Sequence, residues 1–373
     1  MSTPTRDDYA LERAGVASFE APILNYRPPT TKSYAPGIAL VGAGGISFAH
    51  LDAYRKAGYD VRVICNRTLC KAVERRDEFF PTADVASDFK EVIGRDDIEI
   101  VDITTHPDER YEMIESALLA GKHVLSQKPF VLNLDAGLRL VELAERQGLK
   151  LAVNQNGRWA PHLSYMREAV KSGLIGDIMS CHIGIHWNHA WIKDTPFEKI
   201  DDLVLQDFAI HWFDFLVSLV GDRARSVIAT RSRASGQNVH PPLLAQALVQ
   251  FDGGQASLVF DGSTAFGPLD RTYISGTKGS LSSTGPNLGQ QSVELWTDSG
   301  VARPSLVGNW FNDGFLGAMA ELMCAIEEGR DPLHNGRQNL DSLALMFASV
   351  ASVRARKFVA VGSARGCADE GER

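Results

Sequence analysis

The chain has 373 residues. A single hydrophobic core rarely supports a chain of this length, so the length predicts two domains. Hydrophobic residues make up 44% and charged residues 23%, which is typical of a soluble globular protein, and no apolar run is long enough to cross a bilayer. The net charge of −8, with scattered lysines and arginines, argues against a nucleic-acid partner. Because the N-terminus lacks the pattern of a secretory signal, we expect a cytoplasmic location and no membrane partner.

The cysteines are odd in number and widely spaced, and no two form a CxxC pair. This pattern argues against both a disulfide framework and a zinc module, so we expect reduced and mostly buried thiols. They are Cys65, Cys70, Cys181, Cys324 and Cys367.

The first half of the chain shows the alternation of a parallel sheet. Residues 1–36 lack periodicity and predict an N-terminal extension packed over a domain surface. From Gly37, short apolar runs alternate with amphipathic segments of helical length, which indicates right-handed βαβ units in an α/β domain over 37–156. The expected strands are 37–41, 60–65, 98–105, 123–127 and 149–155, and the expected helices are 46–57, a segment ending at 80, 108–120 and 134–147.

After residue 156 the pattern changes to that of an antiparallel sheet. Following a helix at 161–172, short runs with Gly and Ser turns between them predict strands near 178–186, 226–231, 243–251, 256–262 and 271–276. Two helices, 315–329 and 341–357, follow. We therefore expect an α+β C-terminal domain with a large open, mainly antiparallel sheet over 157–361, used for substrate binding and oligomerisation, and a disordered tail over 362–373.

A glycine-rich turn joins the first predicted strand to the first predicted helix. The segment "VGAGGIS" places Gly42, Gly44, Gly45 and Ile46 at the mouth of the helix, with Ser47 where a third glycine or alanine is usual. Gly42 allows a tight turn, and Gly44 allows close approach of a pyrophosphate, which then binds the free amides at the helix start. The strand before and the helix after the motif predict a Rossmann dinucleotide-binding domain.

The second predicted strand ends at Asn66 and Arg67, where an acidic residue normally binds the adenosine ribose of NAD. Arg67 is suited either to a 2′-phosphate or to stacking on adenine, and it is equally compatible with a solvated loop. Asn66 is able to bond a ribose hydroxyl. The cofactor is therefore NAD or NADP, with NAD slightly favoured, and we also assign Thr105, His106 and Gln127 to its site.

Lys128 follows a predicted strand and precedes Pro129, which keeps it extended at the carboxyl edge of the sheet, where ligands bind in open α/β folds. A strand-end lysine is more often simply solvated. Farther along, the apolar segment "QDFAIHWFDFL" contains Asp207, His211 and Asp214. At helical spacing these three residues lie on one face of a helix. These residues form either a buried polar network or an active site.

Together, the glycine loop, the segment "AGKHVLSQKP" and the Asp207-x3-His211-x2-Asp214 pattern resemble the glucose-fructose oxidoreductase, inositol dehydrogenase and rhizopine-catabolism (Gfo/Idh/MocA) family over residues 37–360. The resemblance implies that Lys128, Asp207 and His211 surround the carbon that exchanges hydride with the nicotinamide. It also implies a homodimer or homotetramer formed through the open sheet. Four positions depart from the family pattern, namely Gln127 for Glu, Ala209 for Gly, and Pro107 and Arg110 for Asn and His.

The three residue types suit the oxidation of a hydroxyl. His211 is the expected general base because imidazole titrates near neutral pH, and Lys128 would stabilise the developing alkoxide. Asp207 would orient a second hydroxyl or the histidine. For Asp214 we favour a structural role.

Two further segments supply expected substrate ligands. From "VNQNGRWAPH", which ends at His162, we assign Arg158 and Trp159. From "HIGIHWNHAW", which also contains His189, we assign His186, Asn188 and Trp191. Such side chains suit the hydroxyls and ring faces of a polyol. Although His182 and His186 share a strand face, we expect no metal site.

The leading hypothesis is an NAD(P)-dependent dehydrogenase that oxidises a hydroxyl of a small sugar or cyclitol. The reaction would convert an aldose to a lactone, with a branched pentose such as apiose among the options, or a polyol to a ketone. One alternative is a glycosidase or epimerase that cycles its bound NAD. Another is a non-catalytic regulator that senses nucleotide or sugar, although retention of Lys128 and His211 argues for catalysis.

Overall fold

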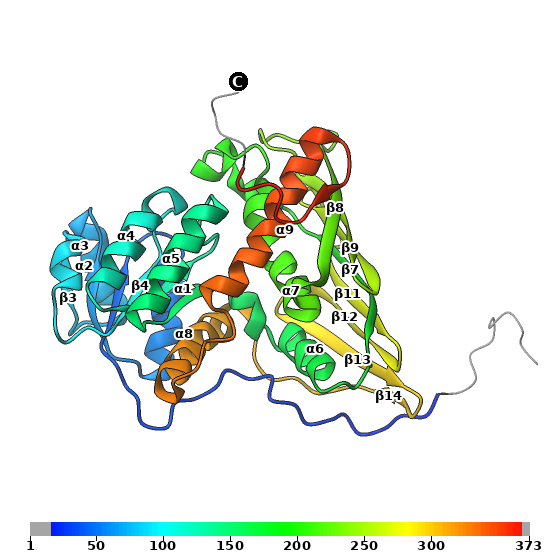
Figure 1. Cartoon of the computed structure of the whole chain (residues 1–373), viewed down its shortest axis with the longest axis horizontal. Coiled ribbons are helices and arrows are strands. Elements are labelled where there is room, and N and C mark those ends of the chain that lie inside the picture. The colour runs from blue at the N-terminus through cyan, green and yellow to red at the C-terminus, as the bar shows by residue number, and fades with distance from the viewer. Residues whose placement is uncertain (1–15, 368–373) are drawn as a thin grey trace, which may run out of the picture.

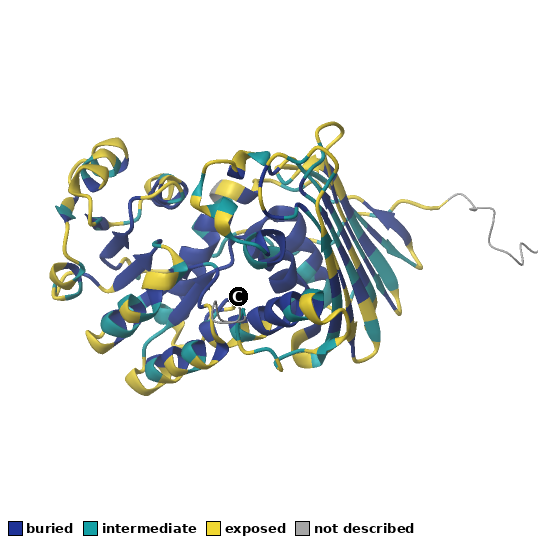
Figure 2. Cartoon of the chain, turned by 90° about the horizontal axis from the view of Figure 1, so that it is seen from above, coloured by how far each residue is buried: buried dark blue, intermediate teal, exposed yellow. Residues whose placement is uncertain are grey.

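The computed structural model describes residues 16–367 and places two sheets side by side, each with its own helices (Figure 1). Buried residues concentrate on the two sheets and on the helix faces that pack against them (Figure 2). Among the described residues, no helix is long and apolar enough to span a membrane.

The N-terminal sheet has six parallel strands in the order β3-β2-β1-β4-β5-β6. The central strands are buried along their length because helices cover both faces. The strands are β1 Ile38–Val41, β2 Val61–Cys65, β3 Asp84–Ala86, β4 Ile100–Ile103, β5 His123–Gln127 and β6 Leu151–Asn154, and the helices are α1 Ser47–Ala57, α2 Leu69–Phe79, α3 Phe89–Ile93, α4 Pro107–Leu119 and α5 Leu134–Gln147. This is the expected Rossmann architecture, to which β3 and α3 are additions.

The second sheet has nine strands in the order β14-β13-β12-β11-β7-β10-β9-β8-β15 and is antiparallel except where β7 and β10 pair in parallel. The strands are β7 Ile178–His186, β8 Ala224–Ser232, β9 Leu244–Phe251, β10 Gly254–Asp261, β11 Leu269–Gly276, β12 Gly279–Asn287, β13 Gln290–Thr297, β14 Gly300–Ala302 and β15 Val359–Ala360, and the helices of this part of the chain are α6 Pro161–Lys171, α7 Ile210–Val220, α8 Trp310–Glu328 and α9 Gly336–Ala355. Helices α6, α7 and α9 pack against the inner face of this sheet. Short helical turns are η1 Asn156–Trp159, η2 Ala190–Ile192, η3 Pro196–Lys199, the π-helical η4 Val204–Phe208 and η5 Gly221–Arg223.

The sequence analysis missed strands β12 to β15. Strand β12 reads "GSLSSTGPN", and its glycines, serines and proline are turn residues in isolation. Pairing with β11 on one side and β13 on the other nevertheless holds it in the sheet. The tertiary partners, rather than local propensity, make it a strand.

Helix α8 does not pack with the domain to which its sequence position assigned it. Its apolar residues Phe315, Met319 and Leu322 share a buried cluster with Ile38 and Leu40 of β1. The helix therefore covers one face of the Rossmann sheet (Figure 1). The domains expected at 37–156 and 157–361 are thus not separate along the chain, because the parallel sheet draws this later helix onto its face.

The N-terminal extension crosses beneath both sheets (Figure 1). At one end, Phe19 N–H donates to Val301 O at 3.1 Å on strand β14. At the other, the Glu327 carboxylate of α8 accepts from the backbone amides of Lys32, Ser33 and Tyr34 at 2.8, 2.7 and 2.9 Å. The segment links the large sheet to the Rossmann side.

The expectation of a disordered tail over 362–373 is wrong for its first part, 362–367. Arg365 O accepts from Leu134 N–H at 2.7 Å, and the Arg365 guanidinium pairs with Asp135 at 2.5 Å. Gly366 also forms a bridge with Asn133. These contacts anchor the segment at the start of α5, whereas 368–373 lie outside the described residues.

Candidate active site

The glycine loop has the shape that a pyrophosphate requires. Gly42 has a φ of +102°, and a Cβ there would lie 2.9 Å from Thr104 Oγ1, so the tight turn requires glycine. A Cβ on Gly44 or Gly45 would meet nothing within 4 Å, which leaves space above the loop. Helix α1 begins after Ile46 with no side-chain cap, and Ser47 N–H and Ala49 N–H donate to Gly44 O and Ile46 O at 3.2 and 3.0 Å. The positive end of the helix dipole is therefore what its start offers to an anion. The loop therefore fits a dinucleotide.

The structure revises the expected role of Asn66. Its Oδ1 accepts Ala43 N–H at 3.0 Å and its Nδ2 donates to Thr68 O at 2.9 Å, so the amide holds the glycine loop. Arg67 is mostly exposed and pairs with Glu109 at 2.8 Å. At the end of β2, the positive charge nearest the expected adenosine site is therefore that of Arg67, which is already paired with the Glu109 carboxylate.

The neighbouring strand end carries Thr105 and His106. Thr105 O accepts from Arg110 Nε at 2.7 Å, and its backbone amide lies beside Gly42. His106 is exposed and precedes α4. Both therefore lie at the carboxyl edge next to the glycine loop.

Lys128 and Asp207 come together from different domains. The Lys128 ammonium lies 2.9 Å from both Asp207 Oδ1 and Asp207 O. Lys128 follows β5, whereas Asp207 lies in the π-helical turn η4 that precedes α7. Burial opposes ionisation of Asp207, but the Lys128 charge and hydrogen bond outweigh it and hold the pKa of the carboxyl below its usual value. The pair is thus an ammonium against a carboxylate.

His211 lies in the first turn of α7, close enough to this pair for both charges to act on it. Burial first, and then the Lys128 charge, lower the pKa of His211 to about 3, although Asp207 opposes the change. Its ring packs 5.5 Å from that of Trp310, and its buried Nδ1 has no hydrogen-bond partner among the described residues. The imidazole is therefore neutral near pH 7 and able to accept a proton.

His189 belongs to the segment that the sequence analysis proposed for sugar binding, although it was not among the substrate ligands assigned there. It is buried, and its ring centroid lies 4.1 Å from that of Phe208. Burial lowers the pKa of His189 to about 4; the Asp207 charge opposes this change, whereas the Lys128 charge adds to it. Trp191, an expected substrate ligand, donates from Nε1 to His189 Nδ1 at 3.4 Å while its ring is largely exposed. The sequence signal for His189 is its place in the aromatic and histidine-rich loop "HWNHAW".

Two expected substrate ligands are buried as structural residues instead. Arg158 Nε and Nη2 donate to both Asp214 carboxylate oxygens at 2.7 and 2.9 Å, so its guanidinium is occupied. The Trp159 ring packs against His334 at 4.8 Å. Both lie in the turn η1, which α8 covers, and burial there leaves no room for a ligand. Asp214 accordingly has the structural role that we favoured.

His186 and Asn188 also depart from expectation. In β7, Cys181, Ile183 and Ile185 face the core, so His182 and His186 lie on the opposite, outer face. His186 Nδ1 lies 3.9 Å from Asp261 Oδ2 on that face, away from the helices that carry Asp207 and His211. Asn188 is exposed and caps its own loop by accepting Ala190 N–H. Neither joins Lys128.

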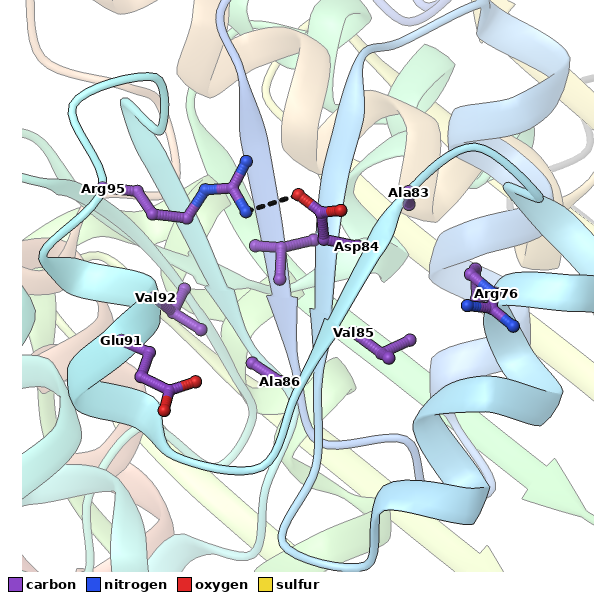
Figure 3. A pocket seen from close by; sticks show the side chains of 9 residues that line it. Arg76, Ala83, Asp84, Val85, Ala86, Glu91, Val92 and Arg95 are labelled. Atoms are coloured by element: carbon purple, nitrogen blue, oxygen red, sulfur yellow. Dashed lines mark hydrogen bonds and ion pairs between the residues drawn. The ribbon is translucent and has the colours of Figure 1, made fainter.

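A pocket beside the edge strand β3 lies apart from these residues (Figure 3). It is crossed by an ion pair between Arg95 and Asp84 at 2.6 Å. In residues 16–367, no three His, Cys, Asp or Glu side chains are grouped to hold a metal ion. Neither the pocket nor a metal-binding group adds a described residue to the candidate site around Lys128, Asp207 and His211.

Comparison with known protein families assigns both parts of the chain. Residues 37–155 match the model described as "Oxidoreductase family, NAD-binding Rossmann fold", and residues 163–282 match the "GFO/IDH/MocA C-terminal domain". The chain belongs to the Gfo/Idh/MocA oxidoreductase family. As a member, it is an enzyme whose Rossmann domain binds NAD.

Similar Gfo/Idh/MocA proteins act on sugars and cyclitols. A D-apiose dehydrogenase of Paraburkholderia graminis is 24% identical over 87% of this chain and 89% of its own length. An inositol 2-dehydrogenase of Rhizobium meliloti is 27% identical over 71% of this chain and 81% of its own. The family assignment and both relatives agree with the expectation drawn from the sequence motifs.

Solved structures confirm the fold of this Gfo/Idh/MocA chain. An Agrobacterium radiobacter oxidoreductase, solved with NAD+, L-tartaric acid and magnesium, superposes with a TM-score of 0.80 at 20% identity, over 88% of this chain and 99% of that one. A levoglucosan dehydrogenase complexed with NADH and levoglucosan gives 0.77 at 20% identity, over 88% and 100%.

Proposed function

We propose that this enzyme is an NAD(P)-dependent dehydrogenase that oxidises one hydroxyl of a small sugar or cyclitol. The observation that carries the proposal is the Lys128 ammonium, 2.9 Å from the Asp207 carboxylate, beside a neutral His211. A nicotinamide cofactor, held at the glycine loop of Gly42, Gly44 and Gly45, would supply the hydride acceptor for the carbinol carbon. The residues of this chain stabilise the negative charge that develops on the substrate oxygen and accept the hydroxyl proton.

In the proposed step, the substrate C–H bond breaks with both electrons leaving as hydride, and the O–H proton passes to His211. The carbon–oxygen single bond becomes a carbonyl, so atoms and electrons balance. Lys128 stabilises the negative charge that develops on oxygen. Asp207 holds the ammonium in place and would accept a hydrogen bond from a neighbouring hydroxyl.

The low pKa of His211 keeps its ring unprotonated before substrate binds, and the proposed step requires that this pKa rise when substrate and cofactor occupy the site. Once hydride has left, the imidazolium would be stabilised by Asp207, which favours protonation of this ring. Nearby, the buried His189 and the exposed Trp191 are suited to contact a sugar ring. A sugar or cyclitol substrate is further supported by the D-apiose and inositol dehydrogenase relatives, with a branched pentose as one option.

The test is the absorbance of reduced nicotinamide, measured with purified protein and NAD or NADP across aldoses, branched pentoses, cyclitols and anhydrosugars. The proposal expects a rise with at least one sugar and one cofactor. Retained cofactor without a rise would overturn it in favour of an enzyme that cycles NAD internally. Binding of sugar without any turnover would indicate a sensor.

A further inference from the structure

A buried chain of polar side chains lies directly behind Lys128 and has no part in the proton transfer proposed above. Lys128 N–H donates to Gln127 Oε1 at 2.7 Å, and Gln127 Nε2 lies 3.4 Å from His50 Nε2. On the other side of the ring, His50 Nδ1 lies 2.7 Å from Asp102 Oδ2. This hydrogen-bond network therefore runs from the Asp102 carboxylate, through the His50 imidazole and the Gln127 amide, to the backbone of the proposed catalytic lysine.

Two more polar side chains, Asn154 and Tyr54, surround His50, and the Tyr54 hydroxyl lies 3.3 Å from His50 Nδ1. Asn154 Nδ2 lies 3.2 Å from His50 Nε2 and 3.3 Å from Gln127 Oε1. Tyr54 donates its hydroxyl to Asp102 Oδ2 at 2.7 Å. The Phe315 ring covers the imidazole at 4.7 Å between centroids. Asp102 is the one charged group in this set, which joins α1, β4, β5, β6 and α8.

The residue types assign each proton in this network. Gln127 Oε1 accepts Lys128 N–H, so the NH2 of Gln127 must face His50. Asn154 also presents its NH2 to the same ring nitrogen. Because both amides donate, His50 Nε2 must be unprotonated, and the single ring proton lies on Nδ1 and is donated to Asp102. His50 is therefore a neutral imidazole of defined tautomer.

We propose that Asp102, His50 and Asn154 are positioning residues, which fix the Gln127 amide and through it the backbone of Lys128. The proposal rests on the proposed function for the role of Lys128. A Gln127 amide turned by half a rotation would set its NH2 against Lys128 N–H and its oxygen against the lone pair of His50. Both contacts are repulsive, so the ring selects one amide orientation.

Arg110 holds the same segment from its other side. Its guanidinium donates to Gln127 O at 2.7 Å and also to Pro129 O, and burial lowers its pKa to about 9. The backbone on either side of Lys128 is therefore fixed through its carbonyls by Arg110 and through its amide by the His50 network. This double attachment limits the movement of the backbone that carries the Lys128 ammonium.

The first test needs no substrate. Nitrogen-15 NMR of the histidine side chains, assigned by loss of one signal in H50Q and by perturbation in Q127E, reports the protonation of His50. We expect a neutral ring protonated on Nδ1 at pH 7 in the wild-type chain. In Q127E we expect a doubly protonated ring between two carboxylates. A wild-type His50 protonated on Nε2, or on both nitrogens, would overturn the proposal.

The second test is kinetic. Replacing Asp102 with Leu should free the ring and lower kcat at least roughly tenfold, with the KM for the sugar and the Kd for cofactor within about twofold. D102N retains an acceptor for Nδ1–H and should fall between D102L and wild type. The control is N339L, which removes a buried amide whose atoms have no partner among the described residues of its surroundings. An unchanged kcat in D102L, or an equal loss in N339L, would contradict positioning.

The two tests separate this inference from the proposed function. If no sugar is oxidised, the proposed function fails, yet the NMR spectrum still decides whether the His50 network has the assigned protons. If sugar is oxidised and the spectrum shows another tautomer, only the positioning inference fails.

Discussion

Arg158 and Asp214 form a bidentate ion pair in the core, with Nε and Nη2 of the arginine 2.7 and 2.9 Å from the two carboxylate oxygens. Ser342 of α9 donates to the same Asp214 at 2.9 Å, so the pair ties η1, α7 and α9 together. The apolar helix that carries the proposed base is thus held in place by a residue three positions along it. His211 and Asp214 share a segment but have different tasks.

Substitution of Asp214 by Ala should destabilise the fold. It leaves the Arg158 guanidinium buried without its carboxylate, which costs about 3–5 kcal/mol in comparable cores. The matched control is E145A, which breaks the exposed Arg337–Glu145 pair and should cost about 1 kcal/mol or less. Urea unfolding of both variants gives the comparison, and equal losses would show that the buried pair is not structurally important.

Lys128→Ala and His211→Ala should each lower kcat/KM by roughly a hundredfold or more, because they remove charge stabilisation and the proton acceptor. Cofactor affinity of H211A, measured by fluorescence titration, should change little. The matched variant is H182Q, on the outer face of β7, which should keep its activity. Near-normal turnover in K128A and H211A would refute their assigned roles.

Glu109 pairs with Arg67, and its removal should shift cofactor preference towards NADP. In E109Q the arginine loses its carboxylate and becomes available to a 2′-phosphate, a charge-assisted contact that is worth roughly a tenfold change in relative kcat/KM. In R67A the shift should be absent. The ratio of kcat/KM for NADP and NAD in the three proteins is the measurement, and an unchanged ratio in E109Q would exclude this control of preference.

Because His162 is buried, we expect the free energy of unfolding to decrease at acid pH. Burial lowers its pKa to about 3, and both ring nitrogens lack partners among the described residues. Since an unfolded histidine has a pKa near 6.5, the unfolded chain binds the extra proton between about pH 6.5 and 3, and stability falls as pH falls through that window. H162L should reduce this slope by up to about 1.4 kcal/mol per pH unit. Urea unfolding at pH 7, 6 and 5 tests it, and an unchanged slope would argue that the ring charges freely in the fold.

Glu327→Ala should release the N-terminal extension from α8. Its carboxylate accepts three backbone amides, which hold the pKa of Glu327 down at about 2. Hydrogen exchange should therefore quicken at residues 32–34, while β1 stays protected. E328A, which alters the neighbouring exposed pair with Arg330, is the control. Unchanged exchange in E327A would mean that other contacts hold the extension.

The sequence by itself determined the two architectures and the residues of the proposed centre. Glycine spacing after a buried strand indicates the nucleotide loop, because few residue types allow that turn. Lys128 before a proline, and Asp207 and His211 at helical spacing, carried the family resemblance. Each of these signals lies within a short stretch of chain, where local backbone requirements limit the choice of residue.

Tertiary structure alone decided which polar residues lie around the proposed centre and which are structural. Arg158 and His189 are both side chains suited to binding a sugar. The Arg158 guanidinium is paired with Asp214, whereas His189 lies close enough to Asp207 and Lys128 for their charges to change its pKa. His50, in turn, meets Asp102 and Gln127 only because adjacent parallel strands and α1 converge. Such contacts join residues far apart in sequence, and side-chain type without position does not specify them.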